Sequence, residues 1–565
     1  MTRTEMTSAD PHASEPSNLG QGTPPELILT NARVYTVDSD RPWAEAVAVT
    51  GGRITAVGTS SDLDALAGPN TEVRDLGGAF LMPGLIDVHN HHFLAGKEEL
   101  FELSVPIGAD LEGIVAAVRD HAAGLSPDAW IVGGPWASDR FGEINTADAL
   151  AQLDAAAGGR PVMLSDDSHH NRWVNSRAME VAGVTAEQEG VVLDSDGRPT
   201  GVLLEAAGLP VARAQQSASA LTPDEERRSA QRGVEILNSF GITSFQDAGV
   251  STHILEALRS LDAAGELNAW VVSSLLINDE IFGFARVGED LVFDGERFRT
   301  EHHRPDFVKI FLDGVPPTRT GAFIEPYLPD DVHGDHFHGE TLLDPAELTD
   351  WLRRVAQAGL SAKIHCTGDA SVHAVLNAVE TLRGEGITET RYQIAHGQFV
   401  HPDDIGRFGP LGVSADISPF IWVPGPIVEA IREVLPRERA DQMQPNRSLL
   451  DAGAVVAGGS DWPVSPSPNA WEGIHGLVTR EDPSGHYPGT LWPEQAITLE
   501  EAIAAFTIGG AEAMGLADEV GSLTPGKSAD FVVLDRDPFD QPTNRLVETT
   551  VTETWFAGRP VYTRD

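Results

Sequence analysis

Between residues 85 and 510 the chain alternates short apolar runs with longer stretches whose apolar residues recur every three or four positions. The runs have the length of buried strands, and stretches such as 344–360 and 370–386 have the periodicity of helices packed on one face. Alternating strands and helices form a parallel sheet, and this many repeats favours an α/β fold, a (β/α)8 TIM-like barrel. The apolar runs are 85–92, 241–247, 307–314, 361–369, 392–398, 412–418 and 454–461.

An open doubly wound sheet is the alternative fold, but no glycine-rich phosphate loop follows the first strand. Residues from about 93 to 221 do not follow the strand–helix repeat. We therefore expect residues 85–510 to form a barrel domain with a large insertion after its first strand.

The two ends of the chain share a different pattern. Residues 26–84 and 511–565 contain short alternating strands separated by tight turns. Neither set of strands is expected to be stable alone, so we expect both to pair in one small β-sandwich built from the two chain ends. Residues 1–25 are polar and lack the apolar core of a secretory signal, which predicts a disordered tail.

The composition is strongly acidic. Lys and Arg number 39 against 85 Asp and Glu, for a net charge of −46 at pH 7. Such a chain repels phosphate backbones and anionic lipid, so we expect no nucleic acid and no membrane partner. The expected partner, a small-molecule substrate, follows from the candidate chemistry described below. The single cysteine, Cys366, excludes an internal disulfide and a cysteine-based zinc site. We expect a cytoplasmic location, with a homodimer as the default assembly.

Metal-coordinating residues gather where the expected strands end. His89 and His91 are two residues apart on the first strand, so both imidazoles point to one face at the barrel mouth. A single histidine is better explained by a hydrogen bond in the core, but donors on five strands together predict a metal centre. The other donors are Lys309, His365, His396 and Asp461.

Lys309 lies inside an apolar run, where a buried ammonium group is costly. One interpretation is an ion pair with Asp313 or another carboxylate. The other is a lysine carbamylated by carbon dioxide, whose new carboxylate would bridge two metal ions. The residues alone leave both interpretations open.

These segments resemble the amidohydrolase superfamily of metal-dependent hydrolases. The general resemblance rests on PGLIDVHNH (83–91), Lys309, His365, His396 and the late GSD (459–461). The sequences HCTGDASVHAVLNAVE and QPNRSLLDAGAVVAGGSDWPVSP resemble more narrowly the branch that contains N-substituted formamide deformylase. The resemblance covers nearly all of the chain beyond residue 25.

The resemblance implies a binuclear centre. His89 and His91 would hold the more buried metal, His365 and His396 the second, and carbamylated Lys309 would bridge them. Asp461 would bind metal and serve as the general base. Zinc suits the imidazole and carboxylate ligands best, and manganese or iron also fit.

The implied reaction is hydrolysis of a linear C–N bond, in an N-substituted formamide or related amide, by a metal-bridging hydroxide. The same barrel acting on a cyclic amide, a carbamate, an ester or a C–C bond is an alternative. A non-catalytic regulatory or binding descendant is a remote alternative, because all six ligand positions are present.

Further residues are candidates for the surroundings of the metals. His170 and Glu205 in the insertion, and Trp462 after the last strand, are candidate substrate-binding residues. Asp247 and Asp313 end strands, where they could orient a metal-bound histidine or Lys309. Four aromatic residues are candidates either for an apolar pocket wall or for the core: Trp136, Phe141, Trp422 and Trp462.

Overall fold

The computed structural model describes residues 23–106, 108–278, 281–284 and 286–564. Its centre is a sheet of eight parallel strands that curves into a nearly closed barrel, in the order β21-β20-β19-β18-β17-β16-β15-β8. A parallel bridge between Asn90 and Trp462 brings the two edges together. The strands are β8 (Leu85–Asn90), β15 (Ile242–Val250), β16 (Trp270–Leu276), β17 (His303–Phe311), β18 (Ser361–Cys366), β19 (Tyr392–His396), β20 (Val413–Ile417) and β21 (Val456–Gly458). The predicted TIM-like barrel is confirmed as a nearly closed barrel of eight parallel strands.

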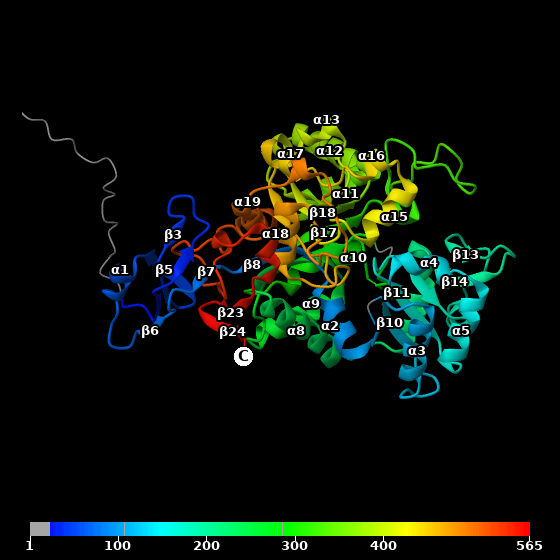
Figure 1. Ribbon diagram of the computed structural model, residues 1–565, viewed down its shortest axis with the longest axis horizontal. Helices are drawn as coiled ribbons and strands as arrows, with labels where there is room; N and C mark the ends of the chain where they lie inside the picture. The colour runs from blue at the N-terminus through cyan, green and yellow to red at the C-terminus, as the bar shows by residue number, and fades with distance from the viewer. Residues whose placement is uncertain (1–22, 107, 279–280, 285, 565) are drawn as a thin grey trace, which may run out of the picture.

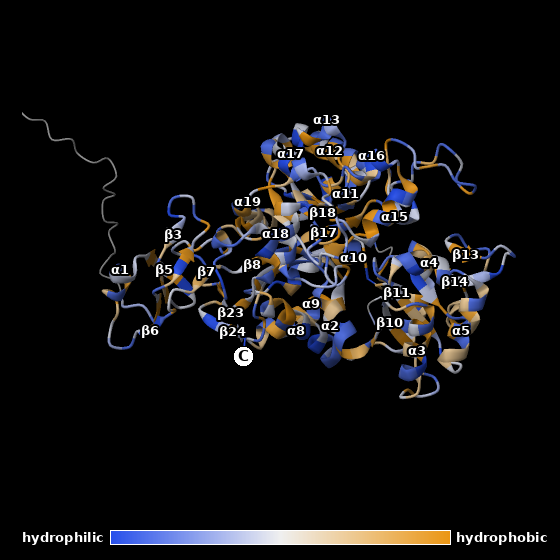
Figure 2. Ribbon diagram, in the orientation of Figure 1, coloured by the Kyte–Doolittle hydropathy of each residue, from blue (hydrophilic) through white to orange (hydrophobic). Residues whose placement is uncertain are grey.

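Helices pack around the barrel because each carries one apolar face. In α11 (Pro345–Gln357) the buried residues Leu348, Leu352 and Val355 recur at helical spacing. The Asp344 carboxylate accepts hydrogen bonds from the first backbone amides and so fixes where this helix begins. Helices such as α15 (Pro426–Val434) show hydrophilic and hydrophobic residues on different sides (Figure 2). Other helices next to the barrel are α8 (Pro223–Ser239), α9 (Thr252–Ala263), α12 (Asp369–Gly384), α18 (Ala470–Thr479), α19 (Leu499–Ala505) and α20 (Ile508–Met514).

A separate six-stranded sheet intervenes between β8 and β15 in the sequence. Its order is β13-β14-β12-β11-β10-β9, and it packs with α3 (Leu111–Ala122) and α5 (Ala147–Ala157) around its own apolar core. Figure 1 shows it in cyan at one side of the barrel. The strands are β9 (Leu103–Ser104), β10 (Ile131–Trp136), β11 (Val162–Asp166), β12 (Arg172–Val174), β13 (Val191–Leu193) and β14 (Pro199–Leu203).

Strands from the two ends of the chain pair with each other. In the sheet β24-β23-β22-β7-β2-β3, the N-terminal strand β7 (Phe80–Pro83) runs antiparallel to the C-terminal strand β22 (Phe531–Leu534). A second sheet, β5-β4-β1-β6, shares apolar core residues with the first. The remaining strands are β1 (Leu27–Thr30), β2 (Arg33–Tyr35), β3 (Trp43–Ala44), β4 (Ala46–Thr50), β5 (Arg53–Gly58), β6 (Glu72–Asp75), β23 (Val551–Phe556) and β24 (Arg559–Thr563).

The described residues include no helix long and apolar enough to cross a bilayer. The predicted tail lies largely outside the described residues, which begin at residue 23.

The shared core of the two end sheets can be tested at Phe531, which is fully buried and stacks on Trp555 with ring centroids 5.3 Å apart. Phe531→Ala is expected to lower the free energy of unfolding by about 3–5 kcal/mol, because it removes a buried ring and leaves a cavity. Urea denaturation measures this loss. The matched control is Phe293→Ala, at a ring that is 46% exposed, and should change stability much less. Equal losses would contradict a packed core at Phe531.

Candidate metal centre and active-site cavity

A cavity of about 750 Å³ opens over the carboxyl ends of the barrel strands. Its walls come from the strand ends and the loops that follow them, from loops of the intervening sheet, and from the helices α2 (His92–Phe101) and α15. The wall is mainly apolar. The large apolar residues that line it include Trp136, Phe141, Leu204, Ile281, Phe282, Phe311, Ile421, Trp422, Ile427, Val434 and Val464.

The six residues expected to bind metal all lie at the base of this cavity. They come from the ends of five different strands, and all are buried in the protein. Parallel strands of a barrel deliver their carboxyl ends to one rim, which brings together residues that are up to 372 positions apart. The six are His89, His91, Lys309, His365, His396 and Asp461.

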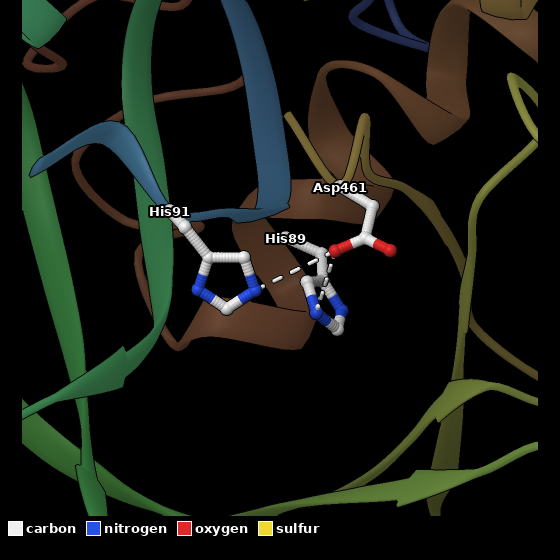
Figure 3. A group of neighbouring side chains, drawn as sticks. All are labelled: His89, His91 and Asp461. Carbon is white, nitrogen blue, oxygen red and sulfur yellow. Dashed lines mark ion pairs between the residues drawn. The ribbon is translucent and has the colours of Figure 1, made fainter. Parts of the chain in front are cut away.

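His89, His91 and Asp461 form the tightest cluster. One ligand atom from each lies within 4.8 Å of the others, a spacing that could hold a metal ion. The Nε2 atoms of both histidines are 3.5 Å from Oδ1 of Asp461. Figure 3 shows both rings facing the carboxylate, with the two contacts dashed. This cluster is a candidate first metal position.

The orientation of His89 is set from behind the cavity. Its Nδ1 lies 2.8 Å from Oδ2 of Asp416, and the same oxygen contacts the ammonium group of Lys363. Lys363 also donates to the carbonyl of Val88 at 2.9 Å. A carboxylate accepts hydrogen bonds, so Nδ1 of His89 carries the proton and Nε2 carries the lone pair.

The Nε2 atom of His89 is buried and has no hydrogen-bond partner in the described part of the chain. Burial is the main cause that lowers the pKa of His89 well below its ordinary value, and the nearby Lys309 and Lys363 lower it further. A neutral imidazole with an unused buried lone pair is the form that binds a divalent metal. The donor set therefore fits a metal ion at this position.

Lys309 has no ion pair in the described residues, and its ammonium group lies 4.7 Å from the centre of the Phe311 ring. Burial is the main cause that lowers its pKa to about 7, and the charge of Lys363 adds to it. The ion pair with Asp313 is absent. Asp313 instead accepts hydrogen bonds from the backbone amides of Ala322, Thr367 and Gly368 and from the Ser371 hydroxyl.

His365 and His396 lie next to the tightest cluster: their ring centroids are 4.7 Å apart, and the ring of His396 is 4.6 Å from that of His89. The Nε2 of His365 is 3.1 Å from the carbonyl of Gly314, which accepts its proton and leaves the lone pair on Nδ1. His396 and Asp461 both have positive φ angles, of 67° and 59°. Non-glycine residues in this region cost conformational energy, and such residues cluster at functional sites.

The expected substrate-binding residues have different positions. His170 lines the cavity, and its Nδ1 lies 2.7 Å from Oε2 of Glu205, which sits behind it. Trp462 is not part of the described lining, which corrects the expectation for this residue. Its ring belongs to the apolar core, and its carbonyl accepts a hydrogen bond from the His91 amide.

The carboxylate of Asp247 forms a hydrogen bond with Nδ1 of His92 at 2.7 Å. It contacts none of the six expected ligands, so it does not orient them. Asp313 approaches His365 only to 3.8 Å and mainly holds the loop after β18. Sequence reasoning missed Asp416, Lys363 and Asp87. Lys363 precedes His365 by two residues and therefore shares its strand face, a signal that could have been found.

Asp87, on the same strand as His89, holds the segment that carries Asp461 against that strand. Its carboxylate accepts hydrogen bonds from the Ser460 amide at 2.9 Å, the Ser460 hydroxyl at 2.6 Å and the His89 amide at 3.0 Å. Gly459 leaves no room for a side chain, because an added Cβ would lie 2.5 Å from Cβ of His89. Asp461 is thus held next to His89 by contacts between the two edges of the barrel.

The sequence model of the amidohydrolase family matches residues 72–562, and the chain belongs to this family. It is 31% identical to N-substituted formamide deformylase of Arthrobacter pascens, over 95% of this chain and 98% of that one. It is 28% identical to Protein LONG AFTER FAR-RED 3 of Arabidopsis thaliana, over 97% of this chain and 94% of that one.

Among solved structures, an uncharacterized metal-dependent hydrolase from Pyrococcus horikoshii is similar, with a TM-score of 0.72 and 23% identity. The match covers 92% of this chain and 99% of that one. At this identity it supports the fold.

The buried contact between Lys363 and Asp416 yields a stability prediction. Lys363→Met is expected to lower the free energy of unfolding by about 3–5 kcal/mol, because it leaves a buried carboxylate without its cation. Lys363→Met/Asp416→Leu should recover part of this loss. In the control Lys97→Met, which removes a pair with Glu102 whose lysine is 28% exposed, the loss should be about 1 kcal/mol or less. Urea denaturation measures the loss for all three variants. Equal losses in Lys363→Met and Lys97→Met would contradict a buried ion pair at Lys363.

Proposed function

We propose that this protein is a metal-dependent hydrolase that cleaves the amide C–N bond of an uncharged N-substituted amide, with N-substituted formamides as the simplest class. The observation that carries the proposal is the meeting of six metal-coordinating side chains under a mainly apolar cavity. Membership of the amidohydrolase family and the similarity to a formamide deformylase support it.

The residues that would hold metal are His89, His91 and Asp461 at one position, and His365 and His396 at a second. Lys309 would join the two positions as a carbamate. Its lowered pKa, about 7, supports this role, because the neutral amine is the form that adds to carbon dioxide. Imidazole and carboxylate donors suit zinc, and also manganese or iron. A bound divalent metal supplies Lewis-acid polarisation of the amide carbonyl and lowers the pKa of water.

Asp461 is the proton carrier of the proposed reaction. Its carboxylate would take a proton from the attacking water and deliver it to the nitrogen as the C–N bond breaks. An amine anion is a poor leaving group, so this second transfer matters more for an amide than for an ester. The products are a carboxylic acid, which is formic acid from a formamide, and an amine.

The lining argues against a negatively charged substrate. Apart from Lys309 at the base, Arg319 is the one Lys or Arg in the described lining. It is already paired with Asp330 at 2.9 Å and donates to the carbonyl of Leu328. A carboxylate on the substrate would therefore find no free guanidinium or ammonium group at the wall and would lose its hydration. The net charge of −46 also repels anionic substrates.

Metal content is the first test. Protein purified without chelator or added metal is expected to contain about two equivalents of metal per chain by elemental analysis. Lys309→Ala should lose metal and activity together, whereas Lys527→Ala, which is outside the cavity lining, should keep both. A folded protein that contains no metal and binds no added zinc would overturn the proposal. One equivalent that is indifferent to Lys309 would remove the bridging carbamate.

Amide hydrolysis is the second test. N-benzylformamide should be hydrolysed, and its analogue with a carboxylate on the ring should react about tenfold more slowly or worse in kcat/KM. Asp461→Asn should lower kcat by about 10²–10⁴-fold, as expected for loss of a general base. Asp403→Asn, at a side chain that is 93% exposed, is the matched control. Near-normal turnover by Asp461→Asn with metal still bound would remove Asp461 from the proton-transfer role.

A further inference from the structure

His170 reaches the metal-site region from outside the barrel. It belongs to the loop between β11 and β12 of the intervening sheet, yet it lines the same cavity as the six strand-end residues. Its ring centroid lies 5.6 Å from that of His365, and its side chain is 8% exposed. Its neighbours Ser168, His169 and Asn171 also line the cavity, so this loop presents a polar stretch to the cavity next to His365.

The two nitrogens of this ring have different surroundings. Nδ1 lies 2.7 Å from Oε2 of Glu205, so the N–H at Nδ1 donates a hydrogen bond to that carboxylate. Nε2 has no hydrogen-bond partner in the portion of the chain that the structure describes. One nitrogen is therefore used to hold the ring, and the other is available for a group in the cavity.

Glu205 is itself held by the barrel. Its Oε1 accepts a hydrogen bond from the Thr320 hydroxyl at 2.7 Å, and Thr320 lies in the segment after β17. Gly314 makes this contact possible, because a Cβ there would lie 2.2 Å from Oγ1 of Thr320 and 2.8 Å from Oε1 of Glu205. The Gly314 carbonyl also bonds the Nε2 of His365. The same short loop thus locates both His365 and the support of His170.

The backbone of Glu205 gives independent support. Its φ angle is +48°, a conformation that is costly for a residue with a side chain and persists where surrounding contacts impose it. Here it directs the carboxylate between Thr320 and His170.

We propose that His170 is a catalytic residue that contacts the scissile amide group of the substrate through Nε2, and that Glu205 is the positioning residue that fixes its ring. This assignment rests on the proposed hydrolysis of N-substituted amides. It gives the sheet between β8 and β15 a direct part in the reaction, because the sheet contributes a hydrogen-bonding group as well as an apolar wall.

Two substitutions of His170 separate this role from a structural one. The side-chain amide of glutamine reaches about as far as Nε2, whereas that of asparagine reaches only as far as Nδ1. With N-benzylformamide, His170→Asn is expected to lower kcat/KM by about 10²-fold, mostly in kcat, as for loss of one transition-state hydrogen bond. His170→Gln should recover about tenfold of that loss. A ring needed only for its bond to Glu205 would give the reverse order.

The contribution of Glu205 is tested by a double-mutant cycle. Glu205→Gln alone should lower kcat/KM about tenfold, and it should have almost no further effect when His170 is already asparagine. Thr320→Val should have a smaller effect in the same direction. Additive losses in the double variant would overturn the positioning role of Glu205.

Metal content and melting temperature are measured for every variant, and the control is His336→Asn, at a side chain that is 88% exposed. If His170→Asn and His170→Gln are equally active, or if asparagine is better, the assignment of His170 is wrong while the proposed function stands. If the metal-loaded wild type hydrolyses no N-substituted amide, both fail. If the His170 variants do not fold, the proposal is tested with Glu205→Gln and Thr320→Val instead. An unchanged kcat/KM in both of these variants would overturn the proposal.

Discussion

The buried contact from Lys363 through Asp416 to His89 is the constraint on which the candidate metal centre depends. An ammonium group and a carboxylate are both costly to bury, and each is tolerated here because it neutralises the other. The carboxylate that balances Lys363 is also the acceptor that decides which nitrogen of His89 is protonated. Because the Asp416 carboxylate accepts the hydrogen bond from Nδ1 of His89, the lone pair on Nε2 is directed to the cavity base.

The barrel and the intervening sheet contribute different things to the cavity. The strand ends contribute the candidate metal ligands, because parallel strands deliver polar residues at their carboxyl ends to one rim. The intervening sheet and α15 contribute both apolar and polar wall residues, and among the polar ones His170 is held by Glu205. Substrate selection can then change in the walls while the ligand set stays on the rigid strands.

Much of this arrangement follows from local pattern. A period of two along each strand places His89 and His91 on one face, and the strand–helix repeat predicts that other strand ends join them. Contacts between distant strands do not follow from local pattern. Asp416 reaches both His89 and Lys363 only because the barrel closes, and Asp247 pairs with His92 because β15 lies beside β8. Trp462 is a wall candidate by sequence. In the structure it pairs with Asn90 where the barrel closes, and its ring lies in the apolar core.

The pairing of β7 with β22 has a consequence for how the protein is made. β7 continues through Gly84 into β8, the strand that carries His89, so one face of the centre is attached to a sheet that needs residues 531–534. Those residues leave the ribosome after every one of the six donor residues. A ribosome-bound chain that has not yet released residues 531–534 therefore has β7 with an unpaired edge, which exposes an aggregation-prone strand. Pairing with residues 531–534 both covers that edge and secures the strand that presents the first two histidines.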